Sequence, residues 1–434
     1  MACFESWGRF PNAQQTLKPL FWSGDFPLQA DPGLSQLPVG MGRSYGDVCL
    51  NDGNLLLLTR KLDHFLSFDT RTGILCCESG VTLAEILDFA VPRGWFLPVT
   101  PGTKFVTVGG AIANDVHGKN HHVAGTFGRH VRRFGLARSD GTRLECSPAK
   151  NAGWYVATIS GLGLTGLIEW AEIQLKPVVS RKIAYRATEF HSLEEFMALS
   201  EANVGCEYTV AWIDCVASSG NSARGIFMCG DHSSTPEPRK ANSKTQITIP
   251  FDLPGFVLNS ATIGLFNTLY FHKQRRKRGV AIVDYEPFFY PLDSVLHWNR
   301  LYGRSGLLQF QCVIPHADGV SAMHELLDVI HSSQLASFLA VLKVFGDLPS
   351  PGMISFPMPG ITLALDFPIK PDRTFALFNR LGQLVAAAGG RIYPAKDACM
   401  TPGQFRAFYP DSSKLRPYID PAFSSSFWRR VNAG

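Results

Sequence analysis

The chain has 434 residues, of which 45% are apolar and 18% are charged, and its formal net charge is +5. That length and balance suit a folded enzyme of two domains and exclude a largely disordered chain. So small and dispersed a charge also argues against a nucleic-acid-binding protein.

The ten cysteines are scattered, and the sequence has neither a C-x-x-C pair nor the Cys/His spacing typical of zinc. We therefore expect reduced thiols rather than a disulfide framework, and no metal site. The amino terminus lacks a basic region followed by an apolar run, which argues against a signal peptide. No run of about 20 apolar residues occurs, so we expect a cytoplasmic or peripheral membrane protein.

Two glycine-punctuated segments stand out in the first part of the chain. The first reads Gly40-Met41-Gly42-Arg43-Ser44-Tyr45-Gly46-Asp47, and the second, 101–113, holds Gly102, Thr107, Val108, Gly109 and Gly110. Glycine lets the main chain approach a ligand closely, and a helix capped by Thr107 would offer N–H groups to a pyrophosphate. The segments therefore predict two walls of a site for a large anionic cofactor. Neither reads G-x-G-x-x-G, which disfavours a Rossmann site.

Between and after these segments the pattern is mixed. Strands are predicted at 55–58 and 74–78, and Thr82 with Glu85 forms a capping box for a helix that Pro92 and Gly94 close. A hairpin follows from strands at 131–137 and 142–146. A glycine-dense loop at 160–166 then leads into a strand at 167–175.

The pattern changes after Lys176-Pro177. Ser192 with Glu195 caps a helix, and 208–215 is a predicted strand. A strand–helix–strand unit then occurs twice, at 307–345 and 361–393, which indicates an antiparallel sheet with helices on one face. We predict an α+β fold with a cofactor domain over 1–177, a substrate domain over 178–390, and a segment 391–434 that packs back on the first domain.

The stretch 236–285 has the least regular pattern. An apolar, aromatic segment over 249–271 is followed by the basic run Lys273-Gln274-Arg275-Arg276-Lys277-Arg278. This combination suits contact with a membrane surface, where apolar burial and attraction to anionic headgroups act together. It equally suits a long mobile loop over the active site with a solvated basic turn, and both interpretations stay open.

The chain resembles the vanillyl-alcohol-oxidase type of FAD protein. The resemblance covers nearly the whole chain from Trp7, and its most specific stretches are 42–47, 107–113, His117-Gly118-Lys119-Asn120-His121-His122, 298–300, 309–311 and 393–397. It implies a two-domain FAD-binding fold. Within the family, the chain is similar to the members that oxidise polyprenylphosphoryl ribose.

The resemblance also implies roles for individual residues. It places FAD against 40–47 and against residues of the second segment and beyond, namely Gly102, Thr107, Val108, Gly109, Gly110, His117, Gly118, Lys119, Asn120, His121, Ile168 and Tyr393. Its catalytic candidates are Lys396, His117 and Tyr290, and its substrate-binding candidates are Lys119, Gln309, Gln311, Lys343 and Lys396. His117 is alternatively a structural histidine, Tyr290 a core aromatic residue, and Lys396 a surface lysine.

Two departures from the family bear on these roles. Tyr45 stands where some relatives carry a histidine that bonds FAD covalently, so we expect non-covalent FAD. Ala364 stands where a relative has a reactive cysteine that catalysis does not require.

The resemblance implies an FAD-dependent oxidoreductase that converts the 2-hydroxyl of a polyprenylphosphoryl ribose to a ketone. A separate nicotinamide-dependent reductase would then complete the epimerisation to an arabinose donor for cell-wall glycan. The alternatives are a soluble alditol or aldonolactone oxidase of the same fold, and a module that keeps FAD as a scaffold.

Overall fold

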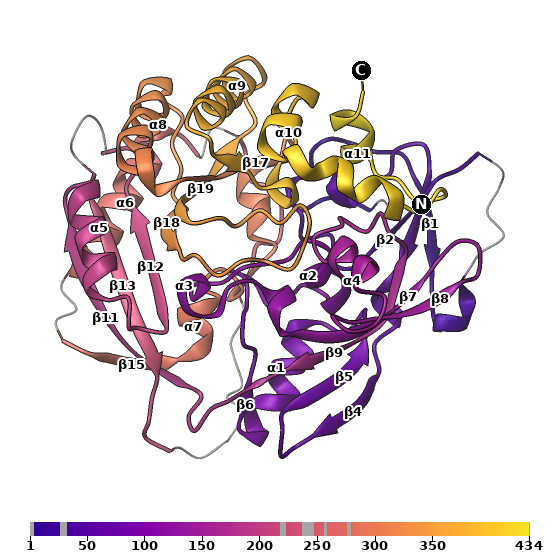
Figure 1. The fold of residues 1–434 in the computed structure, drawn as a ribbon. Helices are drawn as coiled ribbons and strands as arrows, with labels where there is room; N and C mark the ends of the chain where they lie inside the picture. Colours follow the sequence, from indigo (N-terminus) through magenta and orange to yellow (C-terminus); the bar gives the residue numbers. More distant parts are fainter. Residues whose placement is uncertain are drawn as a thin grey trace.

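The computed structural model describes residues 4–26, 33–217, 223–236, 247–255, 258–275 and 279–433. Its strands form a group of sheets near the amino terminus and one large sheet that follows (Figure 1). Across these described ranges, no helix has both the length and the apolar character needed to cross a bilayer.

Two sheets dominate the amino-terminal part. Three parallel strands lie in the order β1 (Thr16–Pro19), β3 (Leu55–Leu58) and β2 (Gln36–Val39). An antiparallel sheet has the order β4 (Phe65–Asp69), β5 (Ile74–Glu78), β9 (Leu167–Gln174), β7 (Val131–Ala137) and β8 (Arg143–Cys146). Short strands β6 (Trp95–Phe96) and β10 (Lys176–Pro177) also pair. The strands predicted at 55–58, 74–78 and 131–137 are confirmed at both ends.

The first helices begin at the capping residues that the sequence predicts. At the start of α1 (Leu83–Ala90), Glu85 N donates to Thr82 Oγ1 and Thr82 N donates to the Glu85 carboxylate. Thr107 caps α2 (Val108–Ala113) by accepting a 3.2 Å hydrogen bond from Gly110 N. Both capped helices are therefore confirmed. The short helices α3 (His121–Ala124) and α4 (Ala152–Thr158) complete this part.

One eight-stranded sheet follows, and every pairing in it is antiparallel, as predicted. Helices α5 (Leu193–Ala202), α8 (Gly319–Ser333) and α9 (Pro371–Ala387) contact its strands, and α8 also contacts both α5 and α9 (Figure 1). The strand order is β15 (Ala281–Asp284), β11 (Lys182–Phe190), β13 (Gly225–His232), β12 (Tyr208–Ile213), β18 (Ala340–Phe345), β19 (Gly360–Pro368), β17 (Leu307–Ile314) and β20 (Arg391–Ile392).

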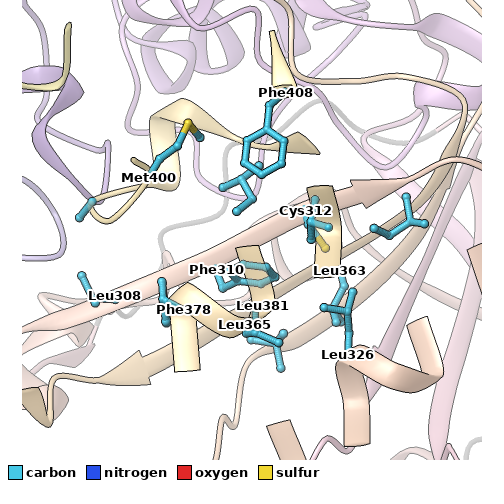
Figure 2. Packing of buried hydrophobic residues seen from close by; sticks show 14 of the residues in the cluster. Leu308, Phe310, Cys312, Leu326, Leu363, Leu365, Phe378, Leu381, Met400 and Phe408 are labelled. Carbon is cyan, nitrogen blue, oxygen red and sulfur yellow. The ribbon is translucent and has the colours of Figure 1, made fainter. Parts of the chain in front are cut away.

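The repeated strand–helix–strand units interleave in this sheet. Strand β19 lies between β17 and β18, and β17 lies between β19 and β20. Each helix therefore crosses over a strand of the other unit, so neither unit forms a sheet alone. Along β17 the side chains alternate: Leu308, Phe310 and Cys312 pack beneath α8 and α9 with Leu363 and Leu365 of β19 (Figure 2). The intervening side chains are then available to the opposite face.

The prediction of an irregular stretch over 236–285 is wrong for part of it. The structure has a sixteen-residue helix, α6 (Ser260–Arg275), then β15 and α7 (Tyr285–Phe289). The sequence has no proline between Pro254 and Pro287, and Asn259 Oδ1 accepts from the N–H groups of Ala261 and Thr262 at the helix start. The rest of the stretch includes β14 (Ile247–Thr248), which pairs with β16 (Val295–Leu296). Residues 237–246, 256–257 and 276–278 lie outside the described residues.

The carboxyl-terminal segment joins both parts of the molecule. Its first residues, Arg391–Ile392, add β20 to the large sheet, which the predicted boundary at 390 separated from it. Helices α10 (Pro402–Phe408) and α11 (Ser426–Val431) follow. Arg430 of α11 forms ion pairs with Asp47, at 2.7 Å, and with Asp397, at 2.9 Å. The pair with Asp47 ties the end of the chain to the first glycine segment, and the pair with Asp397 ties it to the residues after β20.

Candidate active site

A cavity of about 400 Å³ lies between the glycine segments and the large sheet. One wall comes from 38–45, from 100–119 and from 162–168. The opposite wall comes from β12, β17, β18 and the residues around Lys396. A cavity of this volume with a few polar groups in an apolar lining is the usual form of a ligand site.

The glycine wall leaves room for a ligand to contact the main chain. Gly42 has a φ of 60°, which a residue with a side chain rarely adopts. A Cβ on Gly40 would lie 2.2 Å from Thr107 Oγ1, so the two segments touch only because Gly40 has no side chain. Within the described ranges, the N–H groups of Met41, Gly42 and Arg43 donate no hydrogen bond to the protein. Unpaired N–H groups beside a capped helix fit an anionic cofactor such as FAD.

His117 is held as a neutral imidazole in the cavity wall. Burial lowers its pKa well below the usual range, and the nearby charge of Lys343 adds to this effect. Gln311 Nε2 lies 3.0 Å from His117 Nε2, so the amide donates and the histidine proton belongs on Nδ1. Among the described residues, that buried Nδ1 has no hydrogen-bond partner. His117 therefore has a donor left over for a bound molecule.

Two lysines, Lys119 and Lys343, approach the cavity from facing walls. Lys119 Nζ donates to the carbonyl oxygen of Phe288 and lies 4.6 Å from the Phe288 ring centroid. Burial lowers the pKa of Lys119 to about 7 and that of Lys343 to about 8, and the charge of Lys343 adds to the effect on Lys119. Among the described residues, no carboxylate contributes to the pKa shift of either lysine, and cations held in such an apolar lining favour an anionic ligand.

Lys396 is positioned by a cluster at the foot of the cavity. Its Nζ lies 4.0 Å from the ring centroid of Tyr45, and burial lowers its pKa while the charge of Asp366 opposes that effect. Asp366 is fully buried, and its Oδ1 accepts from Gln309 Nε2 at 2.5 Å. Burial raises the pKa of Asp366. Lys396 therefore lies between an aromatic ring and a buried carboxylate.

Strand alternation explains why these side chains meet. In the register of the sheet, Gln309 lies opposite Asp366, Gln311 opposite Ala364, and Lys343 opposite Thr362. These side chains alternate with the apolar ones that pack beneath the helices (Figure 2). The sheet therefore presents a polar strip to the cavity and an apolar core to its helices.

Most of the predicted site residues line this one cavity. They are Gly40, Met41, Gly42, Arg43, Ser44, Tyr45, Gly102, Thr107, Gly109, Gly110, His117, Gly118, Lys119, Ile168, Gln309, Gln311, Lys343, Tyr393 and Lys396. The structure thus brings together residues that are far apart in the sequence.

Other predicted cofactor residues support the wall from behind. Asp47 is paired with Arg430, and a Cβ on Gly46 would lie 1.8 Å from the carbonyl oxygen of Asp397. Val108 is buried in the core, and Asn120 Nδ2 donates to Pro98 O. His121 packs 4.5 Å from the ring of Phe345. Their positions argue against direct contact with the cofactor, because none of them lines the described cavity.

The structure also argues against the catalytic role predicted for Tyr290. Its hydroxyl is 2.6 Å from Thr100 Oγ1, and its ring is fully buried beside Tyr285 and Phe289. Thr100 and Phe289 line the cavity, whereas Tyr290 lies behind them. Tyr290 is a core aromatic residue with a satisfied hydroxyl, which is the alternative that the sequence left open.

Sequence reasoning missed two parts of the lining. The first part consists of Trp7 and Asp293, which surround the predicted residue Arg43. The guanidinium carbon of Arg43 lies 4.1 Å from the ring centroid of Trp7. Burial lowers the pKa of Arg43, and the charge of Asp293 opposes that effect. No motif pointed to Trp7 or Asp293, which lie far apart in the sequence. The second part is apolar and comprises Val210, Trp212, Met228, Tyr270, Leu339 and Val341. In sequence, such residues look like ordinary core positions.

Comparisons with known proteins agree with this geometry. Residues 29–147 match the model of a family described as an FAD binding domain. The chain is 34% identical to the decaprenylphosphoryl-beta-D-ribose oxidase of Mycolicibacterium smegmatis over 90% of this chain and 88% of that protein. It is 32% identical to an uncharacterized protein of Streptomyces coelicolor over 81% of this chain and all of that protein. A mouse L-gulonolactone oxidase is 30% identical over 36% of this chain and 32% of its own length.

The matched FAD-binding region contains both glycine segments and α2, which form one wall of the cavity. The long match to an oxidase extends beyond that region to the strands that carry Gln309, Gln311 and Lys343. The chain belongs to the vanillyl-alcohol-oxidase-type family of FAD-dependent oxidoreductases.

Proposed function

We propose that the protein oxidises the 2-hydroxyl of a polyprenylphosphoryl ribose to a ketone. The observation that carries this proposal is the composition of the cavity wall opposite the glycine segments. It combines the cations of Lys343 and Lys396 with the amides of Gln309 and Gln311, inside an otherwise apolar lining. A phosphate, a sugar and a hydrocarbon chain are the three groups that such a wall would bind. The long match to an enzyme named for this substrate supports the same choice.

The residues divide into two tasks. The main chain of 40–44 and the start of α2 would hold the pyrophosphate of FAD, as unpaired N–H groups and a helix N-terminus do. FAD, when bound, supplies the acceptor for the hydride that leaves the sugar carbon. The apolar lining around Trp212 would take the first part of the polyprenyl chain, and Lys343 with Lys119 would hold the phosphate.

Lys396 and His117 then act on the sugar end. Lys396, fixed against Tyr45 and near Asp366, would anchor the 2-hydroxyl or stabilise negative charge that develops beside it. His117 would donate its unpaired Nδ1–H to the bound molecule, because Gln311 already occupies Nε2. Both groups act by position and charge, and neither needs to leave the wall.

The test is anaerobic mixing of the holoprotein with a short-chain polyprenylphosphoryl ribose while flavin absorbance is followed. We expect the flavin band to bleach. The matched control is the 2-deoxyribose analogue, which carries the same phosphate and lipid and should bind without bleaching. Failure of the ribose compound to bleach the flavin would refute the proposal.

A soluble alditol or aldonolactone oxidase is the alternative with the same cofactor. The match to a gulonolactone oxidase covers 36% of the chain, against 90% for the ribose oxidase, and does not favour it. Bleaching by free alditols at the rate of the lipid substrate would reverse this ranking.

Two further parts of the proposal concern the cofactor and the product. Tyr45, in the first glycine segment, packs against Lys396. A tyrosine at this position offers no imidazole to bond FAD covalently, so acid precipitation should release the flavin into the supernatant. The ketone would pass to a separate nicotinamide-dependent reductase, which returns hydride to give the arabinose epimer. Flavin that stays in the pellet would contradict the first of these statements.

A further inference from the structure

Helix α6 is apolar on two faces, although only one of them packs against the protein. On the inner face, Phe271 joins Trp212 and Ile226 in one buried cluster. On the outer face, Leu265 and Leu269 are each 62% exposed and Phe266 is 49% exposed. A helix with apolar residues on both sides is normally covered on both sides. The outer face of α6 therefore has the composition of a surface that a partner covers.

The orientation of α6 is fixed by polar contacts on its inner face. Asn267 Nδ2 donates to Asp214 Oδ1 at 2.9 Å and to Ser337 O at 3.3 Å, and Asn267 is fully buried. At the start of the helix, Ser260 Oγ donates to Gln334 O at 2.7 Å. Because these contacts hold the opposite side, the helix cannot roll to bury its outer leucines. The exposed stripe of Leu265, Phe266 and Leu269 is therefore a property of the folded protein.

Aromatic rings connect this stripe to the cavity. The ring of Phe266 lies 6.2 Å from that of Tyr270, and the ring of Tyr270 lies 4.9 Å from that of Trp212. Tyr270 and Trp212 both line the cavity. The exposed stripe and the apolar end of the cavity are therefore two sides of one aromatic layer.

The charges on α6 indicate which partner covers the stripe. No acidic residue occurs between Ser260 and Arg275, and the stripe ends in the exposed residues His272 and Lys273. In the sequence Arg276, Lys277 and Arg278 follow, outside the described residues. Exposed leucine and phenylalanine beside lysine and arginine match the surface of a bilayer that contains anionic lipids.

We propose that α6 docks on an anionic bilayer through Leu265, Phe266 and Leu269, with Lys273 against the headgroups. Docking there puts the apolar end of the cavity at the membrane surface, so that a lipid-linked substrate enters without crossing water. This second consequence rests on the proposed function, whereas the docking itself does not.

The test uses the full-length holoprotein and sedimentation with vesicles. One set of vesicles is phosphatidylcholine alone, and the other is equal parts of phosphatidylcholine and phosphatidylglycerol. We expect binding to the anionic set, with a loss of about tenfold or more in the double variant Leu265→Gln, Leu269→Gln, since each leucine contributes buried apolar area. Lys273→Ala should weaken binding in a salt-sensitive way. Val204→Gln, which alters a valine exposed to the same 62%, is the matched control and should leave binding unchanged.

The same variants separate docking from catalysis. The double leucine variant should keep its flavin spectrum and its turnover of a short-chain, water-soluble substrate, because neither leucine lines the cavity. Vesicle binding that equals that of the parent protein in this variant would overturn the proposal, as would failure of the parent protein to bind anionic vesicles. A concentration-dependent dimer that the double variant abolishes, without vesicle binding by the parent, would instead assign the stripe to a second copy of the chain. Docking with no flavin bleaching would leave α6 as the membrane contact and refute the proposed reaction alone.

Discussion

Replacement of Lys343 by methionine should stabilise the protein while it abolishes use of a phosphate-bearing substrate. Burial lowers the pKa of this lysine from its usual 10.5 to about 8, so below pH 8 the folded state carries a desolvated charge. Each pKa unit corresponds to about 1.4 kcal/mol, so the charge of Lys343 lowers the free energy of unfolding by about 3 kcal/mol at most. Part of the side chain faces the cavity, where water solvates the ammonium and reduces that figure. Methionine fills a similar volume without the charge.

The pH dependence gives this prediction its sharpest test. Between pH 8 and 10.5 the unfolded lysine keeps its proton while the folded one loses it, so the stability of the parent protein rises with pH over this window. The gain in unfolding free energy from Lys343→Met should therefore be largest at pH 7 and decrease as the pH approaches 10.5. Urea unfolding at several pH values measures it, and Lys18→Met on the exposed strand β1 is the control. A methionine variant less stable than the parent at pH 7 would refute the reasoning.

Three further predictions address the flavin wall and the foot of the cavity. Lys396→Ala should keep the yellow colour and lose turnover, and a parental rate of flavin reduction by substrate would show that the lysine has no catalytic role. Gly46→Ala should lower the free energy of unfolding by about 3 kcal/mol or more and reduce the amount of bound flavin, because the new Cβ would lie 1.8 Å from the carbonyl oxygen of Asp397. Thermal unfolding measures the first effect, and the flavin content of the purified variant measures the second. Asp366→Asn should remove the destabilisation that comes from ionising a buried carboxyl. Because burial raises the pKa of Asp366 above its usual 3.8, the stability of the parent falls as the pH rises from 3.8 toward the raised value. Its stability relative to the parent should increase over that window, and a constant difference in urea unfolding would contradict this account.

The sequence was sufficient to predict those features that depend on local chemistry. Thr82 and Thr107 each cap a helix at the residue expected, because a capping hydroxyl satisfies N–H groups only two or three residues away. Gly40 and Gly42 marked a wall of the site, since close approach and positive φ depend on the residue itself. Helix α6 was missed because its outer face is apolar, so the usual helical alternation of apolar and polar residues is absent.

The cavity wall on the large sheet contains residues that the sequence alone did not identify as part of the site. Lys343, Gln309 and Gln311 were predicted through the family resemblance, and Lys343 is in addition a charged residue between apolar neighbours in a strand. Val341 lies two residues before Lys343 on the same strand and also lines the cavity, yet its identity is that of any core valine. A polar residue in an apolar strand signals a site by itself, whereas an apolar residue does so only when the fold places empty space beside it. The apolar side of the cavity around Trp212 is therefore visible only in three dimensions.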